Sequence, residues 1–212
     1  MSRWLPVLLV VIVGYLACEA VRDYPRGGRA AVPRSLGEEP TQEALDTPVP
    51  VTVRRGDRTF FVIKTHRFAL TGQVLSAHAY DWVWTNDFFD VDLGLAWGDQ
   101  VARLTEAYSF YQDARFLFWR SSGPVSAGER DYITTHVGNV HTIPAEGKPH
   151  VGRALRSVRE GDLVSLEGFL VVIQDAGTNE LARSSTVRTD TGGGACEVMW
   201  VDRLQVDDTV WE

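Results

Sequence analysis

The sequence predicts a mainly β protein of the α+β class, built as a single small barrel with one or two short helices. Several segments alternate apolar and polar residues with period two, whereas only two stretches show helical spacing. The 212 residues, 44% of them hydrophobic, suit one domain with appendages. An OB-like barrel is the preferred interpretation because a helical stretch lies between β segments. An open α+β sandwich is the alternative.

The expected elements follow from these patterns. Strands are expected at 59–63, 67–74, 115–120, 164–172 and 198–206. Gly168 interrupts the fourth of them and predicts a bend or bulge. Helices are expected over 101–108, with Asp99 as the N-cap, and over 151–158, with Pro149 near the start.

The N-terminal segment predicts a membrane partner. No charged residue occurs between Trp4 and Cys18, and the apolar run reaches the lower end of the length that crosses a bilayer. Residues 1–21 are therefore expected to form a signal anchor, single-pass in a bacterial inner membrane. A cleaved signal peptide and lipidation of Cys18 are the alternatives. Four arginines follow the segment and favour a cytoplasmic domain. The signal-like leader favours export, and we expect a periplasmic domain.

Residues 22–50 are rich in Pro and Gly and poor in large apolar side chains, which predicts a flexible linker. The globular β-rich domain is then expected to occupy residues 51–212. The whole chain has a formal net charge of −7, whereas nucleic-acid-binding proteins are usually basic, so nucleic acid is not an expected partner. Two cysteines, Cys18 in the leader and Cys196 in the domain, offer neither a disulfide framework nor a thiolate metal site. No cofactor and no metal are expected.

Five strings in this order carry a resemblance: DVDLGLAWG (90–98), RFLFWR (115–120), HVGNVHTIPA (136–145), GDLVSLEGFLV (161–171) and TDTGGGACEVMWV (189–201). Together they resemble a family of bacterial proteins with an N-terminal membrane segment and a β-rich domain, over roughly residues 59 to 206. The resemblance implies a membrane-linked β-rich domain and no particular activity, so no residue takes a catalytic role from it.

One catalytic set is available in the sequence. Cys196 as nucleophile, His141 as base and Asp92 as the orienting acid would form a thiol-based site. The glycines before Cys196 bring backbone N–H groups near an oxyanion. The competing interpretation is a structural thiol, because Cys196 opens an apolar strand and free cysteines are often buried.

Other polar and aromatic residues are candidates for binding. Asn139 and His141 lie between expected elements, where sites tend to occur, although hydrogen-bonded loop residues explain them as well. The pair His136 and His141 lacks the spacing of helical zinc ligands. The aromatic cluster Trp82, Trp84, Phe88, Phe89 and Trp97 predicts a contact patch if part of it is exposed.

A basic helix face and an acidic triplet complete the candidates. The face consists of Lys148, Arg153, Arg156 and Arg159, and it suits anionic headgroups or phosphates as well as plain solvent. The triplet Asp190-Thr191-Gly192 matches the aspartic protease signature. A single copy without a preceding apolar strand indicates a glycine-rich turn instead.

We expect from the sequence a membrane-tethered, non-catalytic binding or assembly module of the cell envelope, with an envelope protein as a partner. Two alternatives remain open. One is a cysteine-dependent hydrolase using Cys196 and His141. The other is an OB-like domain that binds nucleic acid or phosphate.

Overall fold

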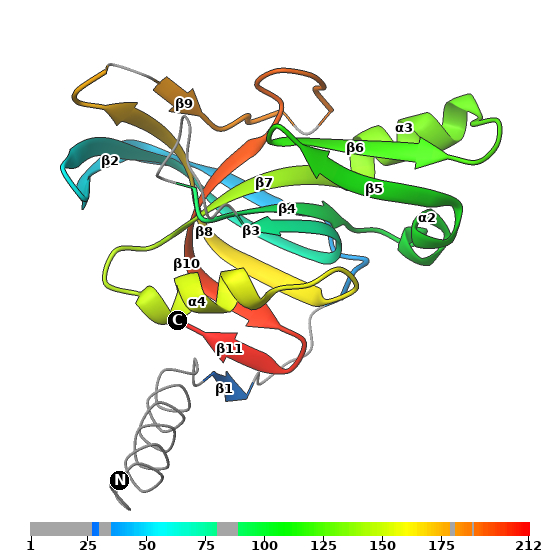
Figure 1. The fold of residues 1–212 in the computed structure, drawn as a ribbon, viewed down its shortest axis with the longest axis horizontal. Coiled ribbons are helices and arrows are strands. Elements are labelled where there is room, and N and C mark those ends of the chain that lie inside the picture. The colour runs from blue at the N-terminus through cyan, green and yellow to red at the C-terminus, as the bar shows by residue number, and fades with distance from the viewer. Residues whose placement is uncertain (1–26, 30–34, 80–88, 179–180, 188) are drawn as a thin grey trace, which may run out of the picture.

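A computed structural model describes residues 27–29, 35–79, 89–178, 181–187 and 189–212. Strand residues make up 55% and helical residues 16%, which confirms the mainly β prediction (Figure 1). Expectations for residues 1–26, including the anchor, lie outside the described residues, as do Trp82, Trp84 and Phe88. None of the described helices is long and apolar enough to cross a membrane.

Nine strands of the described chain belong to one sheet. They are β1 (Gly28–Arg29), β2 (Thr41–Arg55), β3 (Arg58–Ala79), β4 (Val91–Ala96), β7 (Val137–Pro144), β8 (Leu163–Asp175), β9 (Leu181–Arg183), β10 (Glu197–Val206) and β11 (Thr209–Trp211). The pairings run from β3 to β4, β7, β10 and β8, and β8 pairs again with β3. Within this set of five, β7 and β10 are parallel and the other neighbours are antiparallel.

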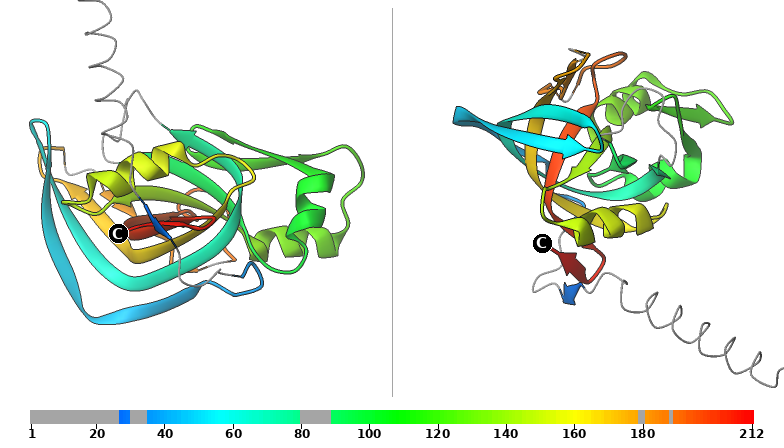
Figure 2. Two further views of the ribbon diagram at one scale, coloured as in Figure 1. Left: turned by 90° about the horizontal axis from the view of Figure 1, so that it is seen from below. Right: turned by 60° about the vertical axis from the view of Figure 1, so that its left-hand side comes forward.

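The longest strand, β3, has 22 residues and unites the two strands expected at 59–63 and 67–74. It pairs with β2, β8 and β4, and its register shifts between Lys64 and His66 and between Val74 and Ser76. Such irregularities bend a strand, which lets β3 curve around the interior (Figure 2). One strand thereby contacts three neighbours.

Gly168 lies where β8 and β10 approach each other most closely. A Cβ atom at this position would lie 1.9 Å from the backbone oxygen of Trp200. The register of β10 shifts between Val201 and Arg203, next to the Gly168–Val201 pair. The predicted irregularity therefore exists, and it sits in β10 opposite the glycine.

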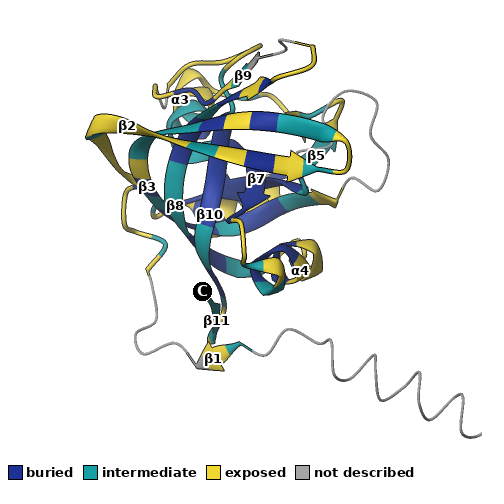
Figure 3. Cartoon of the chain, turned by 90° about the vertical axis from the view of Figure 1, so that its left-hand side faces the viewer, coloured by how far each residue is buried: buried dark blue, intermediate teal, exposed yellow. Residues whose placement is uncertain are grey.

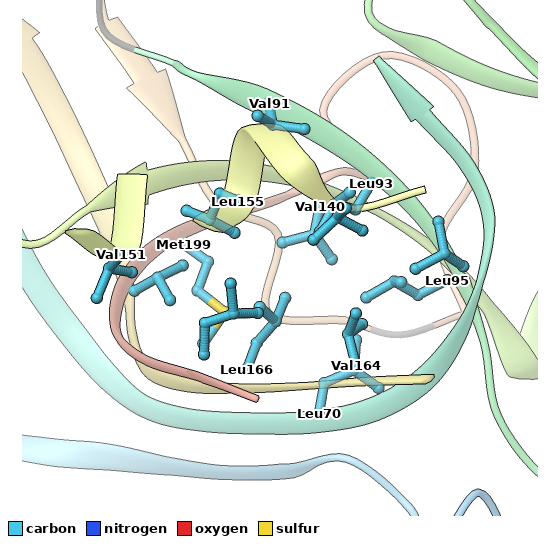
Figure 4. Close-up of a cluster of buried hydrophobic side chains, with 14 of the residues drawn as sticks. Leu70, Val91, Leu93, Leu95, Val140, Val151, Leu155, Val164, Leu166 and Met199 are labelled. Carbon is cyan, nitrogen blue, oxygen red and sulfur yellow. The ribbon is translucent and has the colours of Figure 1, made fainter. Parts of the chain in front are cut away.

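The main core lies between β3, β4, β7, β10 and β8, each of which pairs with the next (Figure 4). Alternate residues of β4 point into it, and Leu93 and Leu95 have no exposed surface. The helix α4 (Pro149–Ser157) covers the interior with Val151 and Leu155. Figure 3 shows the burial concentrated on β10, β7 and the facing side of α4. The helix expected at 151–158 is thus confirmed in place, beginning two residues earlier.

Between β4 and β7 the chain leaves the main sheet and forms a second lobe (Figure 2). This lobe contains α2 (Val101–Ala107), β5 (Tyr108–Asp113), β6 (Phe116–Ser121) and α3 (Ala127–His136). The expected helix at 101–108 is α2, but its N-cap residue is Gln100 instead of Asp99. The strands β5 and β6 pair in a separate two-stranded sheet, called the hairpin below.

The helix α3 is absent from the sequence prediction. Only Ile133 of its ten residues is buried, so an apolar stripe is missing from its sequence. Its start is instead defined by a capping box, in which Ser126 and Glu129 exchange hydrogen bonds. These bonds to Ser126 lower the pKa of Glu129 to about 2.

The expected linker at 22–50 differs from the structure in its second half. The strand β2 begins at Thr41, and Thr41 to Ala44 pair with β3 before a register irregularity that precedes Val49. Most of this segment is exposed, so the sequence lacks the alternation typical of a half-buried strand. Its pairing with β3 supplies the order that composition alone did not predict.

Candidate functional site

Three strands bring the predicted polar residues to one face of the sheet. Asp92 of β4 is the cross-strand partner of His141 in β7, and His141 is the register partner of Val198 in β10. Cys196 precedes the first residue of β10. Because side chains alternate along a strand, Asn139 and His141 lie on the face opposite Val140, which belongs to the main core. The site therefore occupies the outer side of the main sheet.

His141 was expected between elements, but it lies inside β7 and is 9% exposed. Its Nδ1 atom lies 2.8 Å from Oδ1 of Asp92, which is completely buried. With Nδ1 directed at the carboxylate, Nε2 is the ring nitrogen left for a further partner. The ring also packs against Phe89, with centroids 5.4 Å apart.

The environment favours the imidazolium form of His141. Burial lowers the pKa of His141, but hydrogen bonds with Asp92 and Cys196 and the charges of both groups outweigh this and raise it to about 9. The half-buried thiol of Cys196 is near enough to the ring to contribute to this raised pKa. The thiolate is the nucleophilic form of cysteine. Asp92, His141 and Cys196 thus form a continuous polar chain.

Arg115 brings a second charge to Asp92. Its Nη1 atom lies 3.1 Å from Oδ1 and 3.4 Å from Oδ2 of Asp92, and its Cζ lies 5.0 Å from the centre of the Phe89 ring. Arg115 and Ala114 form the turn between β5 and β6, with φ of 69° and 47°. Such two-residue turns favour Asn and Gly, because both central residues need positive φ. The backbone strain lies where the turn meets the buried carboxylate.

Asn139 connects the hairpin with Cys196. Its Oδ1 accepts a hydrogen bond from Nε2 of Gln112 at 2.8 Å, and its Nδ2 donates to the backbone oxygen of Arg115 at 2.8 Å. The same Nδ2 donates to Sγ of Cys196 at 3.4 Å. The amide is 8% exposed. Its three contacts leave it a single orientation.

Gly94 explains how the hairpin comes so close to the site. It is the register partner of Asn139, and a Cβ atom here would lie 2.6 Å from Cδ1 of Leu117. The leucine of β6 therefore occupies the space that any other residue at position 94 would need. This contact seats the hairpin against β4 and β7.

The loop before Cys196 is held by its own hydrogen bonds. The backbone N–H of Ser185 donates to the oxygen of Cys196 at 3.0 Å, and Oγ of Ser185 donates to Asp190 at 2.7 Å. Gly192 and Gly194 have φ of 87° and 93°. Asp190 therefore anchors a glycine-rich turn, in agreement with the turn interpretation of the acidic triplet.

The other predicted binding residues lie elsewhere. Trp97 is 2% exposed and belongs to the main core, so its expected role in an exposed contact patch is wrong. Its flat apolar ring fits the core better than a surface. Phe89 is likewise buried. His136 ends α3 and stacks on Tyr132, with ring centroids 4.0 Å apart.

The expected basic face is exposed on α4 but partly paired. Arg153 and Arg156 are exposed, and Arg156 lies 3.7 Å from Asp90. Lys148 donates to the backbone oxygen of Asp202 at 2.9 Å. These acidic neighbours weaken the case for a phosphate-binding surface at this helix.

Sequence reasoning brought four residues of the site together and missed two. No sequence motif marks Gln112 and Arg115. The hairpin brings them to partners, Asn139 and Asp92, that are more than twenty residues away in the chain. The available signal in the sequence was the pair Arg115 and Arg120 at the two ends of the aromatic string 115–120.

Comparisons with known proteins add no assignment. No protein-family profile matches the chain, and neither curated proteins nor solved structures give a significant match. Over the described residues, no group of three or more His, Cys, Asp or Glu side chains is arranged to hold a metal ion.

Proposed function

We propose that this chain is a cysteine-dependent hydrolase in which Cys196 is the nucleophile, His141 the acid and base, and Asp92 the group that orients the ring. The convergence of Asp92 of β4, His141 of β7 and Cys196, which directly precedes β10, carries the proposal. Nucleophile, base and orienting acid in hydrogen-bonded order are what covalent acyl transfer requires. The proposal reverses the order of the hypotheses drawn from the sequence, where the hydrolase was the alternative to a non-catalytic module.

The chemistry balances with these groups alone. In acylation the Cys196 thiolate attacks the carbonyl carbon of an ester or thioester, so that a C–S bond forms and the bond to the leaving group breaks. The imidazolium of His141 gives its proton to that leaving group. In the second step water attacks the thioester, His141 takes a proton from the water, and the C–S bond breaks to release the acid and the thiolate.

The alternative to catalysis is a buried polar network that only stabilises the domain. Burial of Asp92 at 0% exposure is costly without full pairing, and its contacts with His141 and Arg115 supply that pairing. A purely structural network has no reason to end at a half-buried thiol. The two interpretations therefore differ in one measurable property, the reactivity of Cys196.

We further propose that the five mutually paired strands form an OB-like barrel. In the chain these strands follow one another as β3, β4, β7, β8 and β10, and α4 lies between β7 and β8. In the sheet they pair in the order β3, β4, β7, β10, β8 and back to β3. Barrels of this type bind ligands on the face of their second and third strands and in the adjacent loops. Those strands are β4 and β7, which carry Asp92, Asn139 and His141, and this supports a ligand site here.

The hydrolase proposal is tested by trapping the acyl-enzyme. The full-length protein is mixed with a panel of p-nitrophenyl esters and acyl thioesters of increasing chain length. The reaction is quenched in acid, and the peptide that contains Cys196 is analysed by mass spectrometry. We expect an acyl adduct on Cys196 and release of product. Both should be lost in Cys196→Ser, and both should be slowed in His141→Gln and Asp92→Asn.

The control variant is Cys18→Ser, which removes the other cysteine and should leave turnover unchanged. Turnover that survives Cys196→Ser, or the absence of any Cys196 adduct across the panel, would contradict the hydrolase.

A binding module is the second candidate, and the outer surface of the hairpin favours it. Phe116 and Phe118 are 40% and 42% exposed. Tyr111 stacks on Phe118 with centroids 5.5 Å apart, and Arg120 lies 4.5 Å above the Tyr111 ring. Exposed aromatic residues with a neighbouring arginine are typical of protein-binding surfaces. A photo-crosslinking amino acid at position 118 should capture a discrete envelope partner in cells. An unlinked protein would count against this candidate.

We also propose that residues 1–21 tether the domain to a bacterial inner membrane, on the periplasmic side, as the leader suggests. A C-terminal reporter that is active only in the periplasm tests the orientation. Activity of a cytoplasmic reporter instead would reverse the proposed orientation.

A further inference from the structure

We propose that Asn139 stabilises the Cys196 thiolate through its side-chain N–H, and that the hairpin controls the reactivity of the thiol by holding this amide in place. The inference rests on the proposed thiol site and adds the element that regulates it.

The first step is the orientation of the amide. The backbone oxygen of Arg115 can only accept, so the atom of Asn139 that lies 2.8 Å from it must be the NH₂ group. The carbonyl oxygen of the amide then faces Nε2 of Gln112, which donates to it. A rotated amide would place two acceptors against each other at the Arg115 carbonyl. One N–H is therefore directed at Sγ of Cys196.

The second step is the effect of that N–H. A hydrogen bond becomes stronger when its acceptor carries a negative charge, so this contact favours the thiolate over the thiol. The same contact assists sulfur as it leaves the acyl group in the second half of the proposed reaction. Asn139 is buried, and a donor shielded from water interacts more strongly than an exposed one.

The third step is that both ends of the site depend on one hairpin. Gln112 and the carbonyl of Arg115 hold Asn139 at the sulfur, and the Arg115 guanidinium holds Asp92 behind His141. The strands β5 and β6 pair along their whole length, and Leu117 of β6 packs against Gly94 of β4. A displacement of this hairpin would thus release Asn139 and Asp92 together.

Other ionisable groups also surround the sulfur. The neighbouring elements contribute Asp92, Arg115, His141 and Asp190, and Glu197 follows Cys196 in the chain. Substitutions of uncharged Asn139 and Gln112 leave all of these charges in place. Their effect on the thiol can therefore be read separately from the charges.

The test measures the rate at which iodoacetamide alkylates Cys196 in the full-length protein between pH 4 and 10. Mass spectrometry follows the Cys196 peptide, and glutathione added to the same sample serves as the reference thiol. In Asn139→Ala we expect the pH midpoint of alkylation to rise and the rate at pH 6 to fall roughly tenfold, the scale of a hydrogen bond to a charged group.

Gln112→Met is the second variant, because it keeps the length of the side chain and adds no charge but cannot donate to the amide oxygen of Asn139. It should move the midpoint in the same direction by a smaller amount. Gln112 is only half-buried, so this variant should fold even if Asn139→Ala does not. Ser109→Ala, an exposed position of the same hairpin, is the matched control and should leave the profile unchanged.

The outcomes separate this inference from the hydrolase proposal. Unchanged alkylation profiles in Asn139→Ala and Gln112→Met would overturn the role of Asn139, even if Cys196 forms an acyl-enzyme. Shifted profiles without any acyl transfer would support the role of Asn139 and contradict the hydrolase.

Discussion

At the scale of single residues, the proposed hydrolase depends on the imidazole of His141. Its pKa is raised to about 9 by Asp92 and Cys196 although burial acts against the charge. The ring is therefore an imidazolium at neutral pH, and it can act first as an acid. A cysteine hydrolase with this resting state needs no separate proton donor for its first step.

The raised pKa of His141 also predicts how stability depends on pH. A group whose pKa is higher in the folded state stabilises the fold fully below its unfolded value of 6.5 and loses this as pH rises through about 9. At about 1.4 kcal/mol per unit, the loss is on the order of 3 kcal/mol. Urea unfolding at pH 6 and pH 9.5 measures it. His141→Gln should flatten the change, whereas His66→Gln, outside the site, should keep it. A wild-type profile without a decline in this range would contradict the ion pair.

The turn residue Ala114 carries strain that a substitution can remove. Its φ of 47° is unfavourable for any residue with a Cβ atom, and glycine adopts it freely. Ala114→Gly should raise the free energy of unfolding by about 1 kcal/mol. Ala102→Gly, at an exposed position of α2, provides the opposite control and should lower it by about 1 kcal/mol. Chemical denaturation of the two variants distinguishes turn strain from a general glycine effect.

The sequence identified the residues whose chemistry is recognisable on its own. Cys196, His141 and Asp92 were named as a set because thiol, imidazole and carboxylate have defined roles together. Gln112 and Arg115 could not be found in this way. Their importance comes from a long-range contact of the hairpin, and a glutamine and an arginine occur on most protein surfaces.

At the scale of elements, the hairpin is the part that joins the second lobe to the site. Its strand β6 was expected from the aromatic string at 115–120, while β5 and α3 were not, since each of them has only one buried residue. Periodicity reports which side of an element is buried. An element that contacts the domain through a few side chains therefore leaves little periodic signal.

The seating of the hairpin can be tested at Gly94. A Cβ atom at this position overlaps Leu117, so Gly94→Ala should displace β6 and slow alkylation and acylation of Cys196. Leu117→Ala in the same chain removes the overlapping atoms and should restore part of the rate, as a double-mutant cycle would show. Gly123→Ala, where a Cβ atom meets nothing within 4 Å, is the control. Equal rates in all variants would exclude a role for this contact.

At the scale of the whole molecule, the mainly β class followed from alternation and composition. The order of strand pairing did not, because pairing partners far apart in the chain leave no trace in a single sequence. For example, β10 lies beside β7 and β8, and nothing in the residues 198–206 specifies these two neighbours. The second half of the expected linker was likewise recognisable as β2 only through its pairing with β3.

The strands β8 and β10 pair with each other, and Gly168 of β8 allows the backbone of β10 to approach closely. A Cβ atom here would meet the backbone oxygen of Trp200, which cannot move aside like the end of a side chain. Gly168→Ala should therefore lower the free energy of unfolding by roughly 3 kcal/mol or more, the range of severe packing defects. Thermal unfolding compares it with Gly128→Ala, which meets no atom within 4 Å. Similar melting temperatures would show that the strands separate here without cost.

The short strand β1 has a geometrical consequence for the molecule as a whole. Gly28 pairs with Val210 of β11, and β11 pairs with the last residues of β10 (Figure 1). Cys196 directly precedes the first residue of β10, at its other end. The ten residues of β10 cover about 33 Å at the usual rise of an extended chain. A leader held in lipid would thus keep β1 near the bilayer and present the sulfur to the aqueous side. Water-borne acyl compounds would reach it before any membrane lipid does.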